Sequence, residues 1–215
     1  MRKLLMIIPL LLLYSCGAYI TTISANVNLL NADKLDLTYR AEKCEIPLKD
    51  RDAYYTYEYE VPGIGADTLY SVSRLVMPDI FRSAESVIQM EDATLKTIVG
   101  KGLDVQTYTV GQAIYSTSFT HNVYYTMRIQ CYNGKIRISV YNLHSRNHIA
   151  TRYISTDATY YLNEAITKGV NKEGEILDNV YGALIFAIDD TGRGVINMFV
   201  NTAEKYLKEN FNIGQ

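Results

Sequence analysis

The sequence lacks the charge excess of a nucleic-acid-binding protein. Its 21 Lys and Arg residues face 23 Asp and Glu residues, and the formal net charge is −2. Removal of Arg2 and Lys3 with a leader would leave 19 basic against 23 acidic residues, a net charge of −4. Proteins that bind phosphate backbones carry basic patches, so we expect no nucleic-acid partner.

The common catalytic motifs are also missing. The chain has no G-x-S-x-G elbow, no H-E-x-x-H motif and no Cys/His pair with a family spacing. Asp190-Thr191-Gly192 matches the tripeptide of aspartic proteases, but those enzymes need two such carboxylates and this chain has one copy. We interpret the tripeptide as a helix cap, and we predict a protein that is not an enzyme and uses no cofactor.

Few residues are suited to bind a metal. His144 and His148 are four residues apart, but they follow a predicted strand, where this spacing does not bring two rings together. Residues 123–141 are predicted below to form a β-hairpin, and its register places His144 opposite Val123, two residues from His121. A histidine cluster on the surface therefore stays open as an alternative. No carboxylate or cysteine pattern completes a site, and we predict no metal.

No apolar run is long enough to cross a membrane, which takes ~20 residues. A shorter run from Leu4 to Leu13 follows Arg2 and Lys3, and this layout is typical of a secretory signal peptide. The sequence Leu13-Tyr14-Ser15-Cys16 resembles the lipobox of bacterial lipoproteins, which implies that Cys16 becomes the lipid-modified first residue. A plain signal peptide is the alternative.

The lipoprotein resemblance implies an exported protein with residues 1–15 as signal peptide and 16–52 as a lipid-anchored tether. Several acyl chains give stable anchoring, since each buried methylene contributes about 0.8 kcal/mol. Gly17 follows Cys16 in place of an acidic residue, which in such lipoproteins favours the outer membrane, and we expect the protein to face the periplasm. The tether includes one short strand or helix between Val27 and Leu37.

A β-hairpin between Val123 and Tyr141 is the clearest element. Apolar and polar residues alternate on both sides of Asn133-Gly134, a dipeptide typical of type I′ turns. A two-residue turn pairs Tyr132 with Lys135, and it brings three apolar pairs onto one face: Met127 with Val140, Ile129 with Ile138, and Cys131 with Ile136. Cys131 then acts as a small hydrophobic residue, and a disulfide with Cys44 stays open.

Other elements flank the hairpin. Residues 54–61 alternate as a half-buried strand. A helix capped by Asp67 or Thr68 follows, and Pro78 should kink or end it near Met77.

Two more strands are predicted at 84–91 and 95–105, around a turn at Asp92-Ala93, and 106–122 is predicted as a long connection. Gly100-Lys101-Gly102 predicts a bulge or a close backbone approach, since it lacks the spacing of a phosphate-binding loop.

The C-terminal third is predicted as helical. A helix starts at Ser155-Thr156-Asp157 and ends at Gly169, and a second pattern runs from Ile176 to Ala187. Within it, residues 180–188 could be helix or buried strand. A last helix is capped by Asp189, Asp190 or Thr191, and these helices should cover one face of a sheet.

Four segments together resemble a known family: Thr68-Leu69-Tyr70, Ala84-Glu85-Ser86-Val87-Ile88-Gln89, Ile98-Val99-Gly100-Lys101-Gly102 and Tyr132-Asn133-Gly134-Lys135-Ile136-Arg137. The family is the exported domain of unknown function with a TATA-binding-protein-like (TBP-like) fold, common in Bacteroidota lipoproteins, and the resemblance covers about residues 54–143. It implies an α+β fold in which an antiparallel sheet of about five strands packs against helices.

The TBP-like α+β domain would span residues 53–150, with a C-terminal helical segment at 151–215 packed on the sheet. The chain departs from the family in having no tryptophan in the helix and in carrying Pro78 there. The family brings no catalytic residues with it, and a TBP-like fold does not imply DNA binding.

Tyrosine is abundant, with 19 Tyr against five Phe. Tyr124 and Tyr141 are predicted on the outer face of the hairpin near Arg128 and Arg137, a combination typical of binding hot spots. We therefore predict a non-enzymatic binding module for an envelope protein or glycan. The alternatives are that these tyrosines lie beneath the helices, that the chain carries a small apolar ligand between sheet and helices, or that it is an unrecognised hydrolase.

Overall fold

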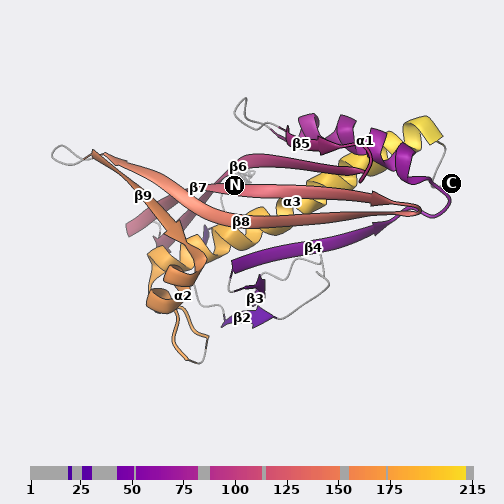
Figure 1. Cartoon of the computed structure of the whole chain (residues 1–215). Helices are drawn as coiled ribbons and strands as arrows, with labels where there is room; N and C mark the ends of the chain where they lie inside the picture. The colour runs from indigo at the N-terminus through magenta and orange to yellow at the C-terminus, as the bar shows by residue number, and fades with distance from the viewer. Residues whose placement is uncertain are drawn as a thin grey trace, which may run out of the picture.

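The computed structural model describes residues 19–20, 26–30, 43–50, 52–81, 88–112, 115–150, 155–172 and 174–211. Strands and helices in these residues follow one another as shown in Figure 1: β1 (Tyr19–Ile20), β2 (Asn26–Leu30), β3 (Lys43–Lys49), β4 (Asp52–Glu60), α1 (Ala66–Ile80), β5 (Ile88–Asp92), β6 (Thr97–Gln112), β7 (Tyr115–Tyr132), β8 (Lys135–Ala150), β9 (Ser155–Tyr161), α2 (Leu162–Gly169) and α3 (Asn179–Phe211).

The strands form one sheet in the order β1-β6-β7-β8-β4-β3-β2, with β5 added to β6 and β9 added to β8. The pairs are antiparallel except β1 with β6 and β2 with β3. Figure 1 shows α3 running behind β7 and β8, and Tyr55 of β4 bonds to Asp189 of α3, so the helices cover one face of the sheet. The predicted α+β fold with an antiparallel sheet packed against helices is confirmed, and the sheet has more strands than the five expected.

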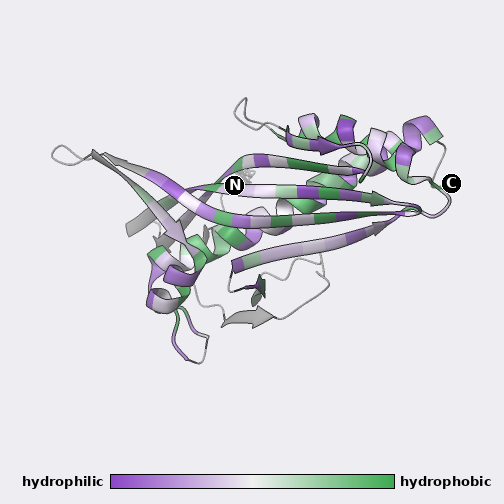
Figure 2. Ribbon diagram, viewed as in Figure 1, coloured by the Kyte–Doolittle hydropathy of each residue, from purple (hydrophilic) through white to green (hydrophobic). Residues whose placement is uncertain are grey.

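The predicted hairpin register is correct. Cys131 pairs with Ile136, Ile129 with Ile138, and Met127 with Val140, and all six side chains are buried. Hydrophobic and hydrophilic residues alternate along both strands (Figure 2), which fixes this register, since a slip by one residue would expose the whole apolar set.

The turn conformation differs from the prediction. A type I′ turn needs positive φ at both central residues, but here only Gly134 has it, at 79°. The turn is held by the loop before α1: Gly134 N–H donates to the Ile64 carbonyl at 2.8 Å, and Val61 N–H donates to the Gly134 carbonyl at 2.7 Å. These long-range bonds, which the dipeptide alone cannot reveal, set the backbone of the turn.

The register shifts beyond this region. A bulge between Tyr124 and Thr126 leaves Asn142 with a φ of 55°, and His144 pairs with Tyr124. The prediction that His144 faces Val123 is therefore wrong, because the extra residue on β8 moves the pairing by one position.

Residues 106–122 are not a connection. β6 and β7 pair residue for residue from Thr97 with Gln130 to Gln112 with Tyr115, which makes one long hairpin. The segment is rich in Thr, Tyr, Val and Ser, and its strand-forming residues extend the ladder beyond the predicted strand end at 105. Strand β5 also begins within the predicted 84–91 segment, whose residues 84–87 lie outside the described part of the chain.

Helix α1 starts and ends differently from the prediction. Its first residue is Ala66, whose N–H donates to Oδ1 of Asn133 at 3.0 Å, so Asn133 from the β7–β8 turn caps the helix in place of Asp67 or Thr68. The helix continues through Pro78 to Ile80. A proline this close to the end removes one hydrogen bond and leaves the last turn in place.

The C-terminal third holds one strand and two helices. Residues 155–161, predicted to begin a helix, form β9 and pair with β8, since a neighbouring strand edge was available. Helix α2 ends at Gly169 as predicted. Residues 180–188 are helical, and α3 runs without a break through Asp189, Asp190 and Thr191. The prediction that these three residues cap a separate helix is wrong, because their side chains bond to the sheet.

The core lies between the helices and the inner face of the sheet. Its largest fully buried side chains come from β3, β4, β6, β7, β8, α1 and α3: Ile46, Tyr55, Leu69, Met77, Ile98, Met127, Ile129, Ile136, Ile138, Ile185, Ile188 and Phe199. A Cβ on Gly100 would lie 2.8 Å from side-chain atoms of Met77 and Phe81, so the predicted close approach at this glycine is present.

Part of the predicted tether belongs to this sheet. β2 (Asn26–Leu30) overlaps the 27–37 segment that is expected to hold a short element, and β3 pairs with β4 and buries Cys44 and Ile46. The signal peptide and Cys16 lie outside the described residues. Among the helices that the structure describes, none is long and apolar enough to cross a membrane.

Candidate binding site on the open face of the sheet

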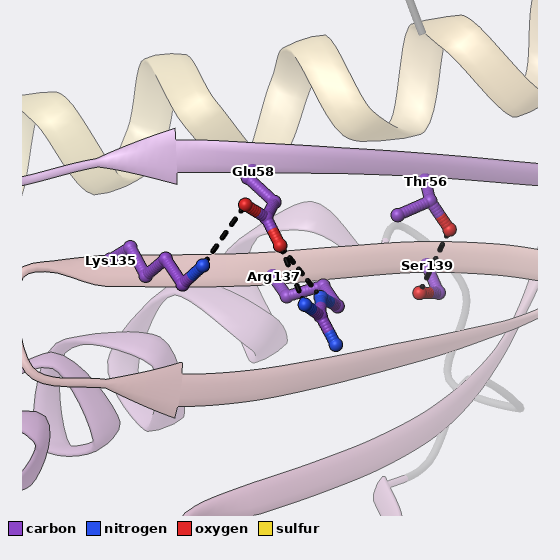
Figure 3. A network of polar contacts seen from close by, with 5 residues as sticks. All are labelled: Thr56, Glu58, Lys135, Arg137 and Ser139. Atoms are coloured by element: carbon purple, nitrogen blue, oxygen red, sulfur yellow. Dashed lines mark hydrogen bonds and ion pairs between the residues drawn. The ribbon is translucent and has the colours of Figure 1, made fainter. Parts of the chain in front are cut away.

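We call the side of the sheet that faces away from α3 the outer face. Its side chains alternate with the buried ones along each strand. They form rows across the sheet that follow the strand pairing: Leu103, Tyr124, His144 and Tyr161; Lys101, Thr126, Tyr141 and Tyr54; Val99, Arg128, Ser139 and Thr56; and Thr97, Gln130, Arg137 and Glu58. Figure 3 shows five outer-face side chains with α3 on the far side of the strands.

Tyr141 lies at the centre of an aromatic and cationic cluster. Its ring stacks on that of Tyr54 with 5.7 Å between the centroids. The Arg128 guanidinium lies 5.4 Å from the centroid of the Tyr141 ring and donates to its hydroxyl at 3.3 Å. At the Tyr54 end of the cluster, Lys49 Nζ is 4.9 Å from the centroid of the Tyr54 ring. The rotamers of these half-exposed side chains are held by one another, which lowers the entropy lost on binding.

Tyr124 belongs to a second aromatic row. The centroids of Tyr124 and His144 are 5.6 Å apart, and those of His144 and Tyr161 are 5.8 Å apart. Tyr161 is 51% exposed, so this row is open to solvent at its β9 end. Tyr124, Arg128 and Tyr141 therefore lie on the outer face as predicted, and the helices cover the other face.

Arg137 is on the same face but is already paired. Its Nε and Nη2 donate to Oε1 of Glu58 at 2.9 and 2.7 Å, and Lys135 Nζ donates to Oε2 at 3.0 Å (Figure 3). The hydrogen bonds from Arg137 and Lys135 lower the pKa of Glu58. Glu58 thus neutralises much of the positive charge of Arg137 and Lys135. Arg137 is therefore less available to a ligand than Arg128.

Sequence reasoning missed two members of this face, Lys101 and Tyr54. Lys101 is exposed and pairs through its backbone with Thr126, next to Arg128 on the same face. Its position depends on the register of β6 against β7, whereas the sequence indicated only the register of the β7–β8 hairpin. Tyr54 was predicted on a strand, but nothing local places that strand beside β8.

The Asp190-Thr191-Gly192 tripeptide lies on the inner side, in the middle of α3. Asp190 accepts a hydrogen bond from the Tyr108 hydroxyl, and Thr191 Oγ1 donates to Oδ2 of Asp104 at 3.1 Å. A Cβ on Gly192 would lie 2.4 Å from the Tyr55 ring. All three residues of the tripeptide therefore meet strands β4 and β6, and they fix the helix on the sheet.

The preceding residue, Asp189, is 5% exposed. Its Oδ1 accepts hydrogen bonds from the Tyr55 hydroxyl at 2.9 Å and from Arg193 Nε at 3.0 Å. Burial raises the pKa of Asp189 to about 6, although Arg193 and Tyr55 oppose the shift. Burial likewise raises the pKa of Cys44 and of Tyr55, and the nearby Asp189 adds to both shifts.

The histidine cluster that the sequence left open as an alternative is not formed by His121 and His144. His121 is on the inner face, where it is buried and its Nδ1 lies 3.3 Å from Ser145 Oγ. Burial lowers the pKa of His121 to about 4. His144 is on the outer face, and nothing is described of the His148 side chain. In the described part of the chain, no three His, Cys, Asp or Glu side chains are grouped to hold a metal.

Cys44 and Cys131 are both buried and carry free thiols. Cys131 Sγ is 3.4 Å from Ser73 Oγ on α1. Its position on the apolar face of the hairpin agrees with a cysteine that packs as a small hydrophobic residue.

A family model described as "Domain of unknown function (DUF4468) with TBP-like fold" matches residues 55–146, which confirms the resemblance seen in the sequence. A solved DUF4468 family protein from Bacteroides ovatus is 17% identical, with a TM-score of 0.54 over 72% of this chain and 90% of that one. A solved TBP-like protein from Parabacteroides distasonis is 13% identical, with a TM-score of 0.56 over 75% and 97%. These likenesses show the fold. A comparison with curated proteins finds no match.

Proposed function

From this domain of unknown function with a TBP-like fold, we propose a non-enzymatic binding module of the bacterial cell envelope. A lipid on Cys16 anchors it at the outer membrane, facing the periplasm, and its ligand binds on the outer face of the sheet. The lipobox-like sequence before Cys16 supports the anchor.

The observation that carries the proposal is the open, pre-ordered set of Tyr124, Arg128 and Tyr141. Helices α1 and α3 fill the inner face and leave these side chains on the other side, half-exposed. Tyrosine and arginine are the residue types that contribute most at binding hot spots, because they combine large contact area with hydrogen bonding. Arg128 contacts Tyr141 and Tyr124 stacks on His144, so these side chains are held in place before a ligand binds, which favours affinity.

The start of the described chain is consistent with an anchor close to the sheet. Tyr19 pairs with Thr109 on β6 and is three residues from Cys16. Three extended residues span at most ~11 Å. An acylated Cys16 would hold this end of β6 near the bilayer surface, while β7 and β8 carry the outer face away toward the Asn133-Gly134 turn.

The anchor is tested by labelling cells with a radioactive or clickable fatty acid and comparing wild type with Cys16→Ser. Label in the wild-type protein alone supports the anchor. Label in both proteins, or in neither, would refute it.

The binding face is tested by gentle purification from solubilised envelopes. Tyr124→Ala/Tyr141→Ala should lose material that co-purifies with the wild type, while Tyr206→Ala on α3 should retain it. Equal recovery from all three, with unchanged melting curves, would refute the role of this face.

A further inference from the structure

Two cations on the outer face are neighbours with no acid between them. Lys101 on β6 pairs with Thr126, and Arg128 is the next outer-face residue on β7. Diagonal neighbours of this kind are about 7–8 Å apart. The described outer-face neighbours of the two cations on β6, β7 and β8 carry no carboxylate: Val99, Leu103, Tyr124, Thr126, Ser139 and Tyr141. Two like charges so placed repel each other, and a bound anion would relieve the repulsion.

Elsewhere on the outer face, a carboxylate compensates for the charge of neighbouring cations. Glu58 takes three hydrogen bonds from Arg137 and Lys135. Arg128, by contrast, contacts the ring and hydroxyl of Tyr141, and in the described part of the chain neither it nor Lys101 is in an ion pair. Among the described residues of β6, β7 and β8, the surroundings of Lys101 and Arg128 therefore carry a net positive charge, although the whole chain is at −2. This charge is complementary to an acidic ligand.

Tyrosine rings lie beside the two cations: Tyr124 on β7 and Tyr141 on β8, whose ring contacts Arg128. Thr126 and Ser139 on the same face are buried, at 5% and 2% exposed, and Ser139 Oγ is 3.3 Å from Thr56 Oγ1. Among the described residues near the two cations, the apolar side chains lie at the β5–β6 side: the half-buried Val99 and Leu103, and the exposed Met90, which pairs with Val99. The core of a protein–protein interface is apolar and poor in charge, which this face is not. Tyrosine rings beside two cations suit a sugar chain that bears acidic groups.

We propose that the outer face binds an acidic glycan, whose carboxylate or phosphate groups are bound by Lys101 and Arg128. The sugar rings and hydroxyls then meet Tyr124 and Tyr141. This inference rests on the proposed function, since it names the ligand class of the same face. Arg128 is suited to the acid because its planar fork matches the two oxygens of a carboxylate or phosphate.

The test is affinity electrophoresis of the detergent-purified full-length protein through gels that contain a soluble polymer. Polygalacturonate supplies carboxylates, phosphorylated dextran supplies phosphates, and plain dextran is the neutral control. Wild type should be retarded by at least one acidic polysaccharide and not by dextran. Lys101→Gln/Arg128→Gln should bind at least about tenfold more weakly, because two charge-assisted contacts are lost. Lys205→Gln/Lys208→Gln on α3 removes the same charge elsewhere and should bind as wild type does.

Three results would overturn the inference. The first is wild type that neither acidic polysaccharide retards. The second is an equal loss in the two charge variants, which would indicate non-specific attraction. The third is equally tight binding of poly-L-glutamate, which would indicate an acidic peptide ligand. If any of these occurs while Tyr124→Ala/Tyr141→Ala still loses a co-purifying envelope component, the ligand class is wrong and the binding face stands.

Discussion

The Tyr55 hydroxyl donates a 2.9 Å hydrogen bond to Oδ1 of Asp189, which joins β4 to the middle of α3. One turn away on the helix, Gly192 lets the same tyrosine ring lie directly against the backbone. This contact holds the helix layer on the inner face of the sheet and leaves the opposite face open. The binding proposed for the outer face depends on this arrangement.

Gly192→Ala should destabilise the fold. The new Cβ would lie 2.4 Å from the Tyr55 ring, which is itself fully buried and cannot move aside. We expect a loss of about 1–3 kcal/mol in the free energy of unfolding, measured by urea denaturation. Gly194→Ala is the matched control, because nothing lies near its Cβ; it should stabilise α3 by roughly 0.5–1 kcal/mol. Equal effects at both positions would contradict the close contact.

Asp189→Asn should change how stability depends on pH. The pKa of Asp189 rises from an ordinary 3.8 to about 6 on folding, so the folded state holds the proton more tightly than the unfolded state. This carboxyl therefore stabilises the fold at low pH, and that contribution is lost as pH rises from about 4 to about 6. The free energy of unfolding of the variant, relative to that of wild type, should increase by on the order of 3 kcal/mol across this pH window and should stay constant at higher pH.

Tyr55→Phe is the companion to this experiment. It keeps the ring but removes the hydroxyl whose hydrogen bond favours the ionised form of Asp189. The pKa of Asp189 should rise further, and the loss of stability should extend to higher pH. A pH profile of either variant that parallels wild type would show that Asp189 is not the buried carboxyl described above.

Asn133→Ala should remove the cap of α1. Asn133 Oδ1 accepts the hydrogen bond from Ala66 N–H, and Asn133 has no positive φ, so alanine fits the turn without strain. The expected cost is about 1 kcal/mol in the free energy of unfolding. Asn133→Asp keeps the acceptor and should cost much less. If both substitutions have the same effect, the cap bond contributes nothing measurable.

Cys44 and Cys131 should not react with a thiol reagent in the folded protein. They are 1% and 4% exposed, and burial raises the pKa of both thiols. In a Cys16→Ser variant we expect no thiol to react with Ellman's reagent in native buffer and two to react in guanidinium. One fast-reacting thiol, or none after unfolding without reductant, would contradict two buried free cysteines.

The sequence pattern correctly predicts those parts of the fold that neighbouring residues determine. The alternation around Asn133-Gly134 fixes the β7–β8 register because each strand has one buried face. Gly169 ends α2 as its pattern indicates, but a Cβ there would lie 2.3 Å from Cβ of Tyr181, so this glycine also answers a close contact with α3. The bulge at Asn142 and the long β6–β7 hairpin depend on contacts with other strands, and the sequence gives little sign of them.

The same distinction applies to the candidate site. Tyr124, Arg128 and Tyr141 were predictable because they alternate with the core of one hairpin. Lys101 and Tyr54 come from neighbouring strands, and Arg137 lies on the predicted face, but the pattern of the hairpin could not show that its partner Glu58 lies beside it on β4. Asp189, Asp190 and Thr191 resemble a helix start locally, but partners on β4 and β6 satisfy them inside one helix.

The most direct test of the central claim is site-specific photo-crosslinking in living cells. A benzophenone amino acid replaces Tyr124 on the outer face or, as control, Tyr206 on α3. We predict a crosslinked species from position 124 that is absent from position 206 and is competed by the ligand-bearing envelope fraction. No species at position 124, or the same species from both positions, would contradict the outer face as the binding surface.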